Sequence, residues 1–162
     1  MKRNQVGDYM VKIFYPSIYF RLGENPDAPP SAGFPDNSLG KKLAESLKVG
    51  DRMIMYITEP EKRFVGLVEV IGSMRELKNS QWPYDVPIKI VIGPKDPGVT
   101  FEEAGIDWRP SVGNTLLSID EDEWDRIIEL LERQPDLSDD AIQQKRKEYK
   151  GIRRTEFIRN DN

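Results

Sequence analysis

The segment Arg52–Ile71, "RMIMYITEPEKRFVGLVEVI", carries the strongest structural signal in this sequence. Arg52–Thr58 and Phe64–Ile71 are apolar runs rich in β-branched and aromatic residues, a composition typical of strands. The polar connection "EPEKR" between them favours a hairpin with a slightly long loop. We therefore expect two antiparallel strands here.

Segments on both sides of this hairpin predict further strands. In the run before Gly93, alternation would place Ile88, Ile90 and Ile92 on one face and Lys89 on the other. Asn25–Ser38 contains four prolines and a glycine, so we expect it to be a loop. The additional predicted strands are Tyr9–Tyr15, Pro87–Ile92 and Thr115–Ile119.

Capping residues and apolar spacing predict two or three helices. Asn37 or Ser38 caps a short helix, and Asp120 with Glu123 forms a capping box at the start of a second one. A third helical stretch, Asp139–Lys150, is nearly all polar, so it is a solvated extension, a linker, or a segment that orders on a partner. The apolar positions are Leu39, Leu43 and Leu47 in the first helix and Trp124, Ile127, Ile128 and Leu131 in the second.

A chain of 162 residues has room for one compact domain and an appendage. The five to six short strands and two to three helices predict an α+β domain built on a strongly curved sheet or small barrel. We assign residues 1–134 to this domain and residues 135–162 to a polar, basic helical tail or linker. No apolar run approaches the roughly 20 residues of a membrane span, and the first ten residues lack a secretory signal, so we expect a cytoplasmic protein without membrane contact.

Two residue types are missing, and their absence excludes much of enzyme chemistry. Without cysteine there is no disulfide, thiolate nucleophile or cysteine-bound zinc. Without histidine the commonest acid-base group near neutral pH and every Ser-His or Cys-His arrangement are excluded. The formal net charge is −4, but residues 141–162 carry seven basic and three acidic side chains, which leaves −8 on residues 1–140. This asymmetry suggests that the tail has its own partner.

Four stretches are informative together: "LKVGDRMIMYIT", "FVGLVEVIGSM", "QWPYDVPIKIVI" and "GNTLLSIDEDEWDRIIELL". In this order and spacing, across residues 9–133, they resemble an EVE domain, a member of the PUA-like superfamily that also includes YTH and ASCH domains. The resemblance implies a PUA-like pseudo-barrel with an aromatic pocket for a nucleobase, often a modified one. It also implies a link to restriction systems, because bacterial relatives sense altered bases in DNA, whereas YTH relatives read methylated adenine in RNA.

Candidate pocket residues lie at the entry to the strand Pro87–Ile92 and just after the first strand. A base pocket needs a ring for stacking and polar groups that read the base edge. Two rings and a carboxylate come from "WPYD", and "SIYF" would form the opposite wall. The alternative is that these side chains close the barrel end and pack beneath the loop. The predicted base-binding set is Trp82, Tyr84, Asp85, Ser17, Tyr19 and Phe20.

A second predicted set would contact nucleic acid at the rim of the pocket. An indole beside a guanidinium suits bases and phosphates, and lysines in the tail would bind phosphates without reading sequence. The alternatives are packing for the tryptophan and a solvated face for the tail. The rim set is Trp108, Arg109, Lys145, Arg146 and Lys147.

We therefore predict a non-catalytic recognition module, without metal or cofactor, that takes up a modified, flipped base. DNA is favoured over RNA, and any cleavage or translocation would belong to a partner nuclease or NTPase chain or to a missing domain. The alternatives are a module for modified RNA or tRNA and a small-molecule-binding or adaptor domain. Asp51, Glu76 and Lys78 match the residue types of a metal-dependent nuclease, but the segment around Glu76 lacks strand alternation, so we do not expect a nuclease site there.

Overall fold

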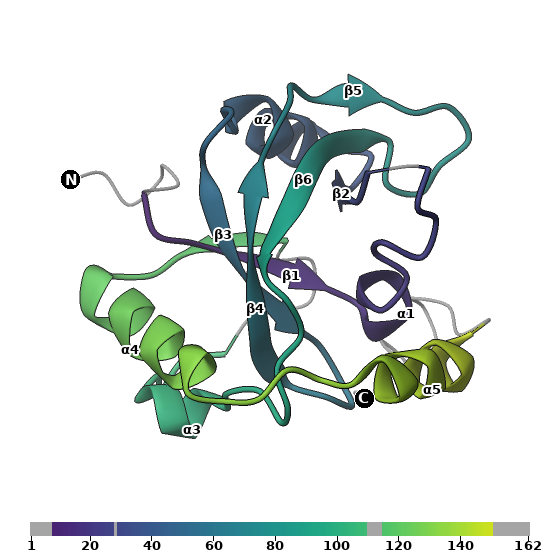
Figure 1. The fold of residues 1–162 in the computed structure, drawn as a ribbon. Coiled ribbons are helices and arrows are strands. Elements are labelled where there is room, and N and C mark those ends of the chain that lie inside the picture. Colours follow the sequence, from purple (N-terminus) through teal and green to yellow (C-terminus); the bar gives the residue numbers. More distant parts are fainter. Residues whose placement is uncertain (1–7, 28, 110–114, 151–162) are drawn as a thin grey trace.

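The computed structural model describes residues 8–27, 29–109 and 115–150. Within them, seven strands form one curled sheet (Figure 1). β1 and β3 are parallel, and all other neighbouring strands are antiparallel. The strand order is β2 (Ser31–Phe34), β6 (Tyr84–Ile92), β4 (Arg63–Val70), β3 (Arg52–Ile57), β1 (Met10–Phe14) and β7 (Leu116–Ser118), and β5 (Arg75–Glu76) pairs with β6.

Apolar side chains fill both faces of this sheet, because successive residues of a strand point to opposite sides. In β3, Met53 and Met55 belong to one cluster, which we call the inner cluster and which also contains Phe14 and Phe34. Ile54 and Tyr56 belong to the other, the outer cluster. Burial on both faces explains why the β3 sequence is apolar at nearly every position rather than alternating.

Five helices of the described residues cover the two clusters. The short helix α1 (Pro16–Tyr19), α2 (Ser38–Ser46) and α5 (Asp139–Tyr149) contribute buried residues to the inner cluster. α3 (Phe101–Ala104) and α4 (Glu121–Glu132) contribute to the outer cluster and lie together at the lower left of Figure 1. The arrangement is an α+β pseudo-barrel, which confirms the predicted fold class. None of these helices has the length and apolar composition needed to span a membrane.

Local sequence signals predict several of these elements well. The hairpin β3–β4 and the strands β1 and β7 lie within the predicted segments. The Asn37 side chain accepts a 2.7 Å hydrogen bond from the backbone of Gly40 and caps α2. At α4 the predicted capping box is present, because Asp120 accepts from the Glu123 amide and the Glu123 carboxylate accepts from the Asp120 amide.

The prediction that Asn25–Ser38 is entirely loop is wrong, because Ser31–Phe34 forms β2. This strand pairs with β6, and its Ala32 and Phe34 are fully buried. The prolines of the segment flank β2 and do not interrupt its ladder, which is compatible with an edge strand. Tertiary pairing therefore overrides a composition that is typical of loops.

The predicted common face of Ile88, Ile90 and Ile92 is also wrong. Opposite β6, the register of β4 shifts between Leu67 and Val68, so that Leu67 pairs with Ile92 and Val68 pairs with Ile90. Such a bulge resets the alternation of a strand. Ile88 consequently packs in the inner cluster, Ile92 packs against the outer cluster, and Ile90 is 39% exposed.

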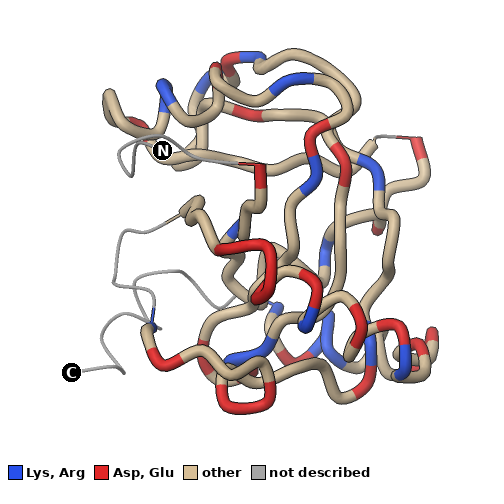
Figure 2. Tube along the Cα trace, turned by 90° about the vertical axis from the view of Figure 1, so that its left-hand side faces the viewer, with Lys and Arg blue, Asp and Glu red and all other residues tan. Residues whose placement is uncertain are grey.

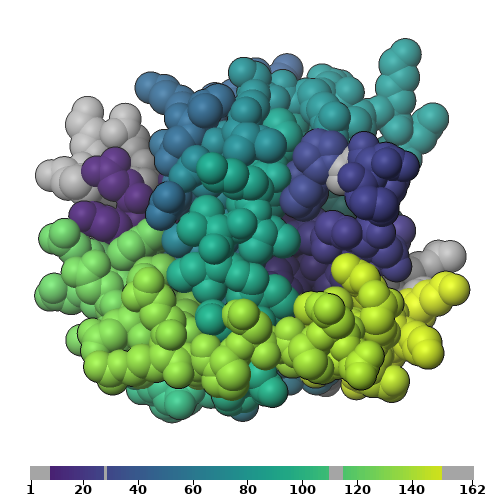
Figure 3. Space-filling view, viewed as in Figure 1, coloured from purple at the N-terminus to yellow at the C-terminus, as the bar shows by residue number. Residues whose placement is uncertain are grey.

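The polar helix α5, predicted as a solvated extension, a linker or a segment that orders on a partner, packs against the inner cluster through Tyr149. Its Tyr149 is 3% exposed and stacks on Phe20, with ring centres 5.8 Å apart. The Tyr149 hydroxyl donates to the Glu61 carboxylate, which also pairs with Lys145 at 2.6 Å. In the space-filling view α5 lies directly below the segment that follows α1 (Figure 3). One aromatic ring and a shared carboxylate thus hold a helix that has little apolar surface.

Candidate functional site

A cavity of about 330 Å³ lies where β1, α1, β2 and the entry of β6 meet. Its lining comes from four segments, within residues 12–15, 18–25, 31–33 and 77–85. α1, β2 and β6 lie close together on the right-hand side of Figure 1. Pockets that bind small ligands measure about 300–1,000 Å³, so this cavity has room for one flat ring system and its substituents.

An aromatic wall forms one side of the cavity. Trp82 is half-buried, and its ring centre lies 5.9 Å from that of Tyr15, with the two planes tilted by 48°. A ring inserted between two others needs parallel planes about 7 Å apart, twice the roughly 3.5 Å contact distance. Trp82 and Tyr15 both line the cavity, and at this tilt they do not form a sandwich around a ring.

Glycine in β2 makes this position of Trp82 possible. A Cβ atom added to Gly33 would lie 2.7 Å from the Cβ of Trp82, closer than two carbon atoms approach without a clash. The Trp82 amide donates a 3.0 Å hydrogen bond to the Ser80 hydroxyl, which fixes the backbone before the strand begins. Both Gly33 and Ser80 line the cavity. The wall is thus shaped by the pairing of β2 with β6.

Asp85 supplies a carboxylate to the cavity lining. It is 4% exposed and accepts a 2.8 Å hydrogen bond from Nε of Arg75, whose side chain is 54% exposed. The two residues are paired neighbours in β6 and β5. A buried carboxylate is stable only when it is paired, and the guanidinium fulfils that need while it holds the carboxylate in one orientation.

The most unusual lining residue is Lys12, which is not among the site residues predicted from the sequence. It is 2% exposed, and its Nζ donates a 3.0 Å hydrogen bond to the carbonyl of Ile13. Burial lowers the pKa of Lys12 to about 7 from the usual 10.5. A signal was present in "MVKIF", because alternation puts Lys12 on the same face as Met10 and Phe14, which are both core residues.

The structure brings two of the six predicted base-binding residues to the cavity, Trp82 and Asp85. Tyr84 is half-buried and packs against the inner cluster, and Ser17 is half-buried in α1. Tyr19 and Phe20 belong to the inner cluster, with their ring centres 5.1 Å apart. None of these four is among the residues that line the cavity. Burial also raises the pKa of Tyr19 above its ordinary value.

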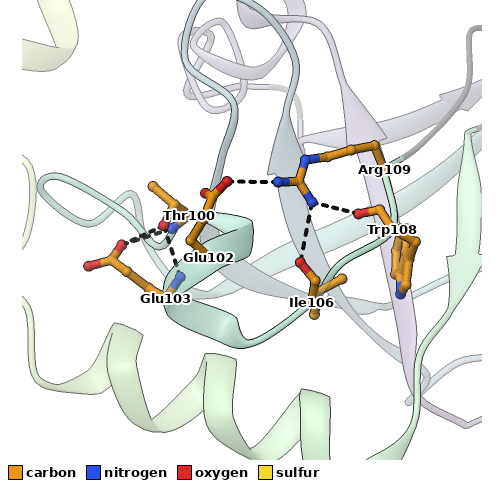
Figure 4. Close-up of polar contacts among 6 residues, drawn as sticks. All are labelled: Thr100, Glu102, Glu103, Ile106, Trp108 and Arg109. Carbon is orange, nitrogen blue, oxygen red and sulfur yellow. Dashed lines mark hydrogen bonds and ion pairs between the residues drawn. The ribbon is translucent and has the colours of Figure 1, made fainter.

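The predicted rim residues Trp108 and Arg109 lie on the opposite side of the sheet, against the outer cluster. Figure 4 shows the Arg109 guanidinium directed at Glu102, with a 2.7 Å ion pair, and at the carbonyls of Ile106 and Trp108. It also lies 4.5 Å from the ring centre of Phe101. The Arg109 guanidinium is therefore already engaged in contacts within the chain.

In α5, two of the three predicted basic residues make contacts within the chain. Lys145 pairs with Glu61, and Nε of Arg146 donates a 2.6 Å hydrogen bond to the carbonyl of Phe20. Lys147 is exposed. The basic residues 153, 154 and 159 lie outside the described residues.

The cavity lining contains as many basic as acidic residues. The basic lining residues are Lys12 and Arg21, and the acidic ones are Glu24 and Asp85. Nε of Arg21 lies 3.7 Å from a carboxylate oxygen of Glu24. On the side of the molecule that carries α4, Figure 2 shows a continuous acidic stretch, which corresponds to the start of that helix. Among the described residues no three histidine, cysteine, aspartate or glutamate side chains gather as a metal site would require.

No family model matches this chain, and no curated protein matches it in sequence. Solved structures do match its fold. A hypothetical protein from Leishmania major aligns with a TM-score of 0.59 at 14% identity, over 81% of this chain and 98% of that one. A protein from Agrobacterium tumefaciens aligns with a TM-score of 0.57 at 16% identity, over 81% and 99%.

A third similar structure has a named ligand. The YTH domain of the Zygosaccharomyces rouxii MRB1 protein, solved in complex with N6-methyladenosine RNA, aligns with a TM-score of 0.54 at 14% identity, over 82% of this chain and 94% of that one. At such identities the match concerns the fold. The chain therefore has the PUA-like pseudo-barrel fold that YTH domains also adopt.

Proposed function

We propose that this chain is a non-catalytic recognition module that binds a single modified nucleobase in the cavity beside Trp82. The observation that carries the proposal is the half-buried Trp82–Tyr15 wall next to the fixed carboxylate of Asp85. Stacking of a base on an aromatic side chain contributes roughly 1–3 kcal/mol, and polar groups at the same site read the base edge. The wall supplies the first contribution, and Asp85 and Lys12 supply the second.

The finer assignment within this proposal is an EVE-type reader of DNA, in which the base is flipped out of the duplex. Its support is the sequence resemblance across residues 9–133 together with the shared PUA-like fold. A nuclease or NTPase in another chain or domain would then act on the sensed DNA. Because the similar YTH domain was solved with RNA, modified RNA is the competing ligand class.

The balanced charge of the cavity lining favours a second candidate, a free base or nucleoside bound without a polynucleotide. A nucleic-acid reader usually presents a basic surface that follows the phosphates. If phosphate contacts contribute, the dissociation constant of an oligonucleotide will rise steeply with salt. A free nucleoside bound in the same cavity will show no such dependence.

The test is a binding screen by fluorescence anisotropy, with short DNA and RNA duplexes and single strands that carry methylated or hydroxymethylated bases. For the best ligand, we expect Trp82→Ala to weaken binding roughly 5- to 150-fold, the equivalent of 1–3 kcal/mol. Trp124→Ala is the matched control, because Trp124 contacts Tyr9 beside the outer cluster. Equal affinity of folded Trp82→Ala and wild type would refute the pocket.

A further inference from the structure

Lys12 is a buried amine that has no counter-ion among the described residues. It is 2% exposed in the middle of β1, and among the described residues no carboxylate lies within ion-pair distance of its Nζ. The hydrogen bond to the Ile13 carbonyl uses one of the three ammonium protons. A buried cation with so little compensation is costly, and the group relieves that cost by giving up its proton.

Two aromatic rings lie beside the amine. Nζ lies 4.8 Å from the ring centre of Phe14 and 4.8 Å from that of Phe34. Phe14 and Lys12 are both among the residues that line the cavity. The other charged groups of the lining are Arg21 and Glu24, which follow α1, and Asp85 in β6, which is paired with Arg75 of β5.

This environment makes the amine a nucleophile at neutral pH. With its pKa lowered to about 7, about half of the Lys12 side chains are uncharged at pH 7. For a lysine at the usual pKa the uncharged fraction is roughly one in three thousand. Desolvated lysines of this kind form Schiff bases with carbonyl compounds.

We propose that Lys12 reversibly captures, as an imine, a flat ring that carries an aldehyde and enters the cavity along the Trp82–Tyr15 wall. The Nζ lone pair attacks the carbonyl carbon, and a proton passes from nitrogen to oxygen to give a carbinolamine. The nitrogen lone pair then forms the C=N bond while the C–O bond breaks, and the oxygen leaves as water with the remaining N–H proton. The step is a condensation, so it needs neither an oxidant nor a reductant.

The cavity restricts the aldehydes that fit. Its volume admits one ring system, and stacking on the wall favours an aromatic or heteroaromatic ring over an alkyl chain. If the ligand is a modified base, as the proposed function holds, it is a pyrimidine with a formyl substituent. Lys12 would then recognise that substituent by forming an imine with it. The imine chemistry itself needs only the ring and the aldehyde, so the two proposals can fail separately.

The experiment incubates the full chain at pH 7 with pyridine-4-carboxaldehyde, or with 5-formyl-2′-deoxycytidine, in the presence of cyanoborohydride. Reduction of an imine adds the mass of the aldehyde less one oxygen atom, and peptide mass spectrometry locates it. We expect labelling of Lys12 at least about tenfold above exposed lysines such as Lys89, because of its larger uncharged fraction. Labelling of Lys12 should rise through pH 7 and then level off, while that of exposed lysines continues to rise.

Mapping is performed on the wild-type chain, so the result does not depend on whether a Lys12 variant folds. Lys12→Met should abolish the preferred adduct, and Lys89→Met should leave it unchanged. Even labelling of all lysines, or an unlabelled Lys12, overturns the proposal. Capture of pyridine-4-carboxaldehyde without binding of any base leaves the imine site standing and rejects the base reader. Binding of 5-methyl-2′-deoxycytidine without capture of its formyl analogue supports the base reader and rejects the imine site.

Discussion

At the scale of single residues, Lys12 reduces the stability of the fold. Its Nζ lies beside the rings of Phe14 and Phe34, and its ammonium form is desolvated with no paired carboxylate among the described residues. A methionine of similar length would occupy the same space at no charge cost. A lysine at this position is therefore unfavourable for folding. A role of its amine in binding a ligand would explain why the position is not apolar.

The first prediction concerns the pH dependence of this cost. The folded-state pKa of Lys12, about 7, lies below the usual 10.5, so between these values the unfolded chain holds a proton that the folded chain lacks. The free energy of unfolding should therefore rise with pH across this window. Lys12→Met should stabilise the protein by a few kcal/mol at pH 6, at about 1.4 kcal/mol per pKa unit, and by much less near pH 10.

Urea unfolding of both proteins at the two pH values measures this difference. Lys89→Met is the control, since Lys89 is 58% exposed and pairs with Glu69 at 3.4 Å. A stability difference between Lys12→Met and wild type that does not change with pH would contradict a lowered pKa. It would also leave the nucleophile without its physical basis.

At the scale of elements, the docking of α5 depends on few contacts. The Tyr149 ring lies parallel to that of Phe20, within 2°, and Glu61 accepts hydrogen bonds from both Tyr149 and Lys145. Burial, followed by the hydrogen bond to Glu61, raises the pKa of Tyr149. The remainder of the helix is largely polar, so these contacts carry most of its attachment.

The second prediction is that Tyr149→Ala releases α5 while the sheet stays folded. Truncation of a buried aromatic ring typically costs about 3–5 kcal/mol, more than the polar contacts of this helix can replace. Hydrogen exchange of residues 139–149 should become fast, and exchange in β3 and β4 should be nearly unchanged. Exposed Lys147→Ala is the control. Uniformly faster exchange throughout the chain would mean that α5 is an integral part of the core.

At the scale of the whole molecule, the sheet separates two apolar clusters, and the cavity lies on one side only. Its lining belongs to β1, α1, β2 and the entry of β6, whereas α3 and α4 pack on the outer cluster. A ligand in the cavity would therefore join segments that are far apart in the sequence. Binding to the folded state alone increases the free energy of unfolding.

The third prediction is that a ligand identified in the screen stabilises the chain by about 2.7 kcal/mol at a concentration of one hundred times its dissociation constant. Ligand-induced hydrogen-exchange protection should concentrate in β1, β2 and the start of β6. Protection centred on α3 and α4 would place the binding site on the outer side and would contradict the cavity assignment.

The sequence alone was sufficient for features that depend on near neighbours. The capping box of Asp120 and Glu123, the hairpin β3–β4 and the aromatic character of the entry to β6 follow from local spacing and composition. The absence of cysteine and histidine likewise follows from the sequence, and with it the exclusion of much enzyme chemistry. The PUA-like fold was accessible because the order of these signals resembles a known family.

Tertiary structure alone decided which side chains meet in the cavity. Ser31–Phe34 becomes a strand because β6 offers it backbone partners, and only then does Gly33 lie beneath Trp82. Phe20 is covered because α5 returns from the end of the described chain. Lys12 is an ordinary strand residue until the curled sheet encloses it. Burial depends on segments distant in the sequence, and local periodicity contains no information about which of them will come together.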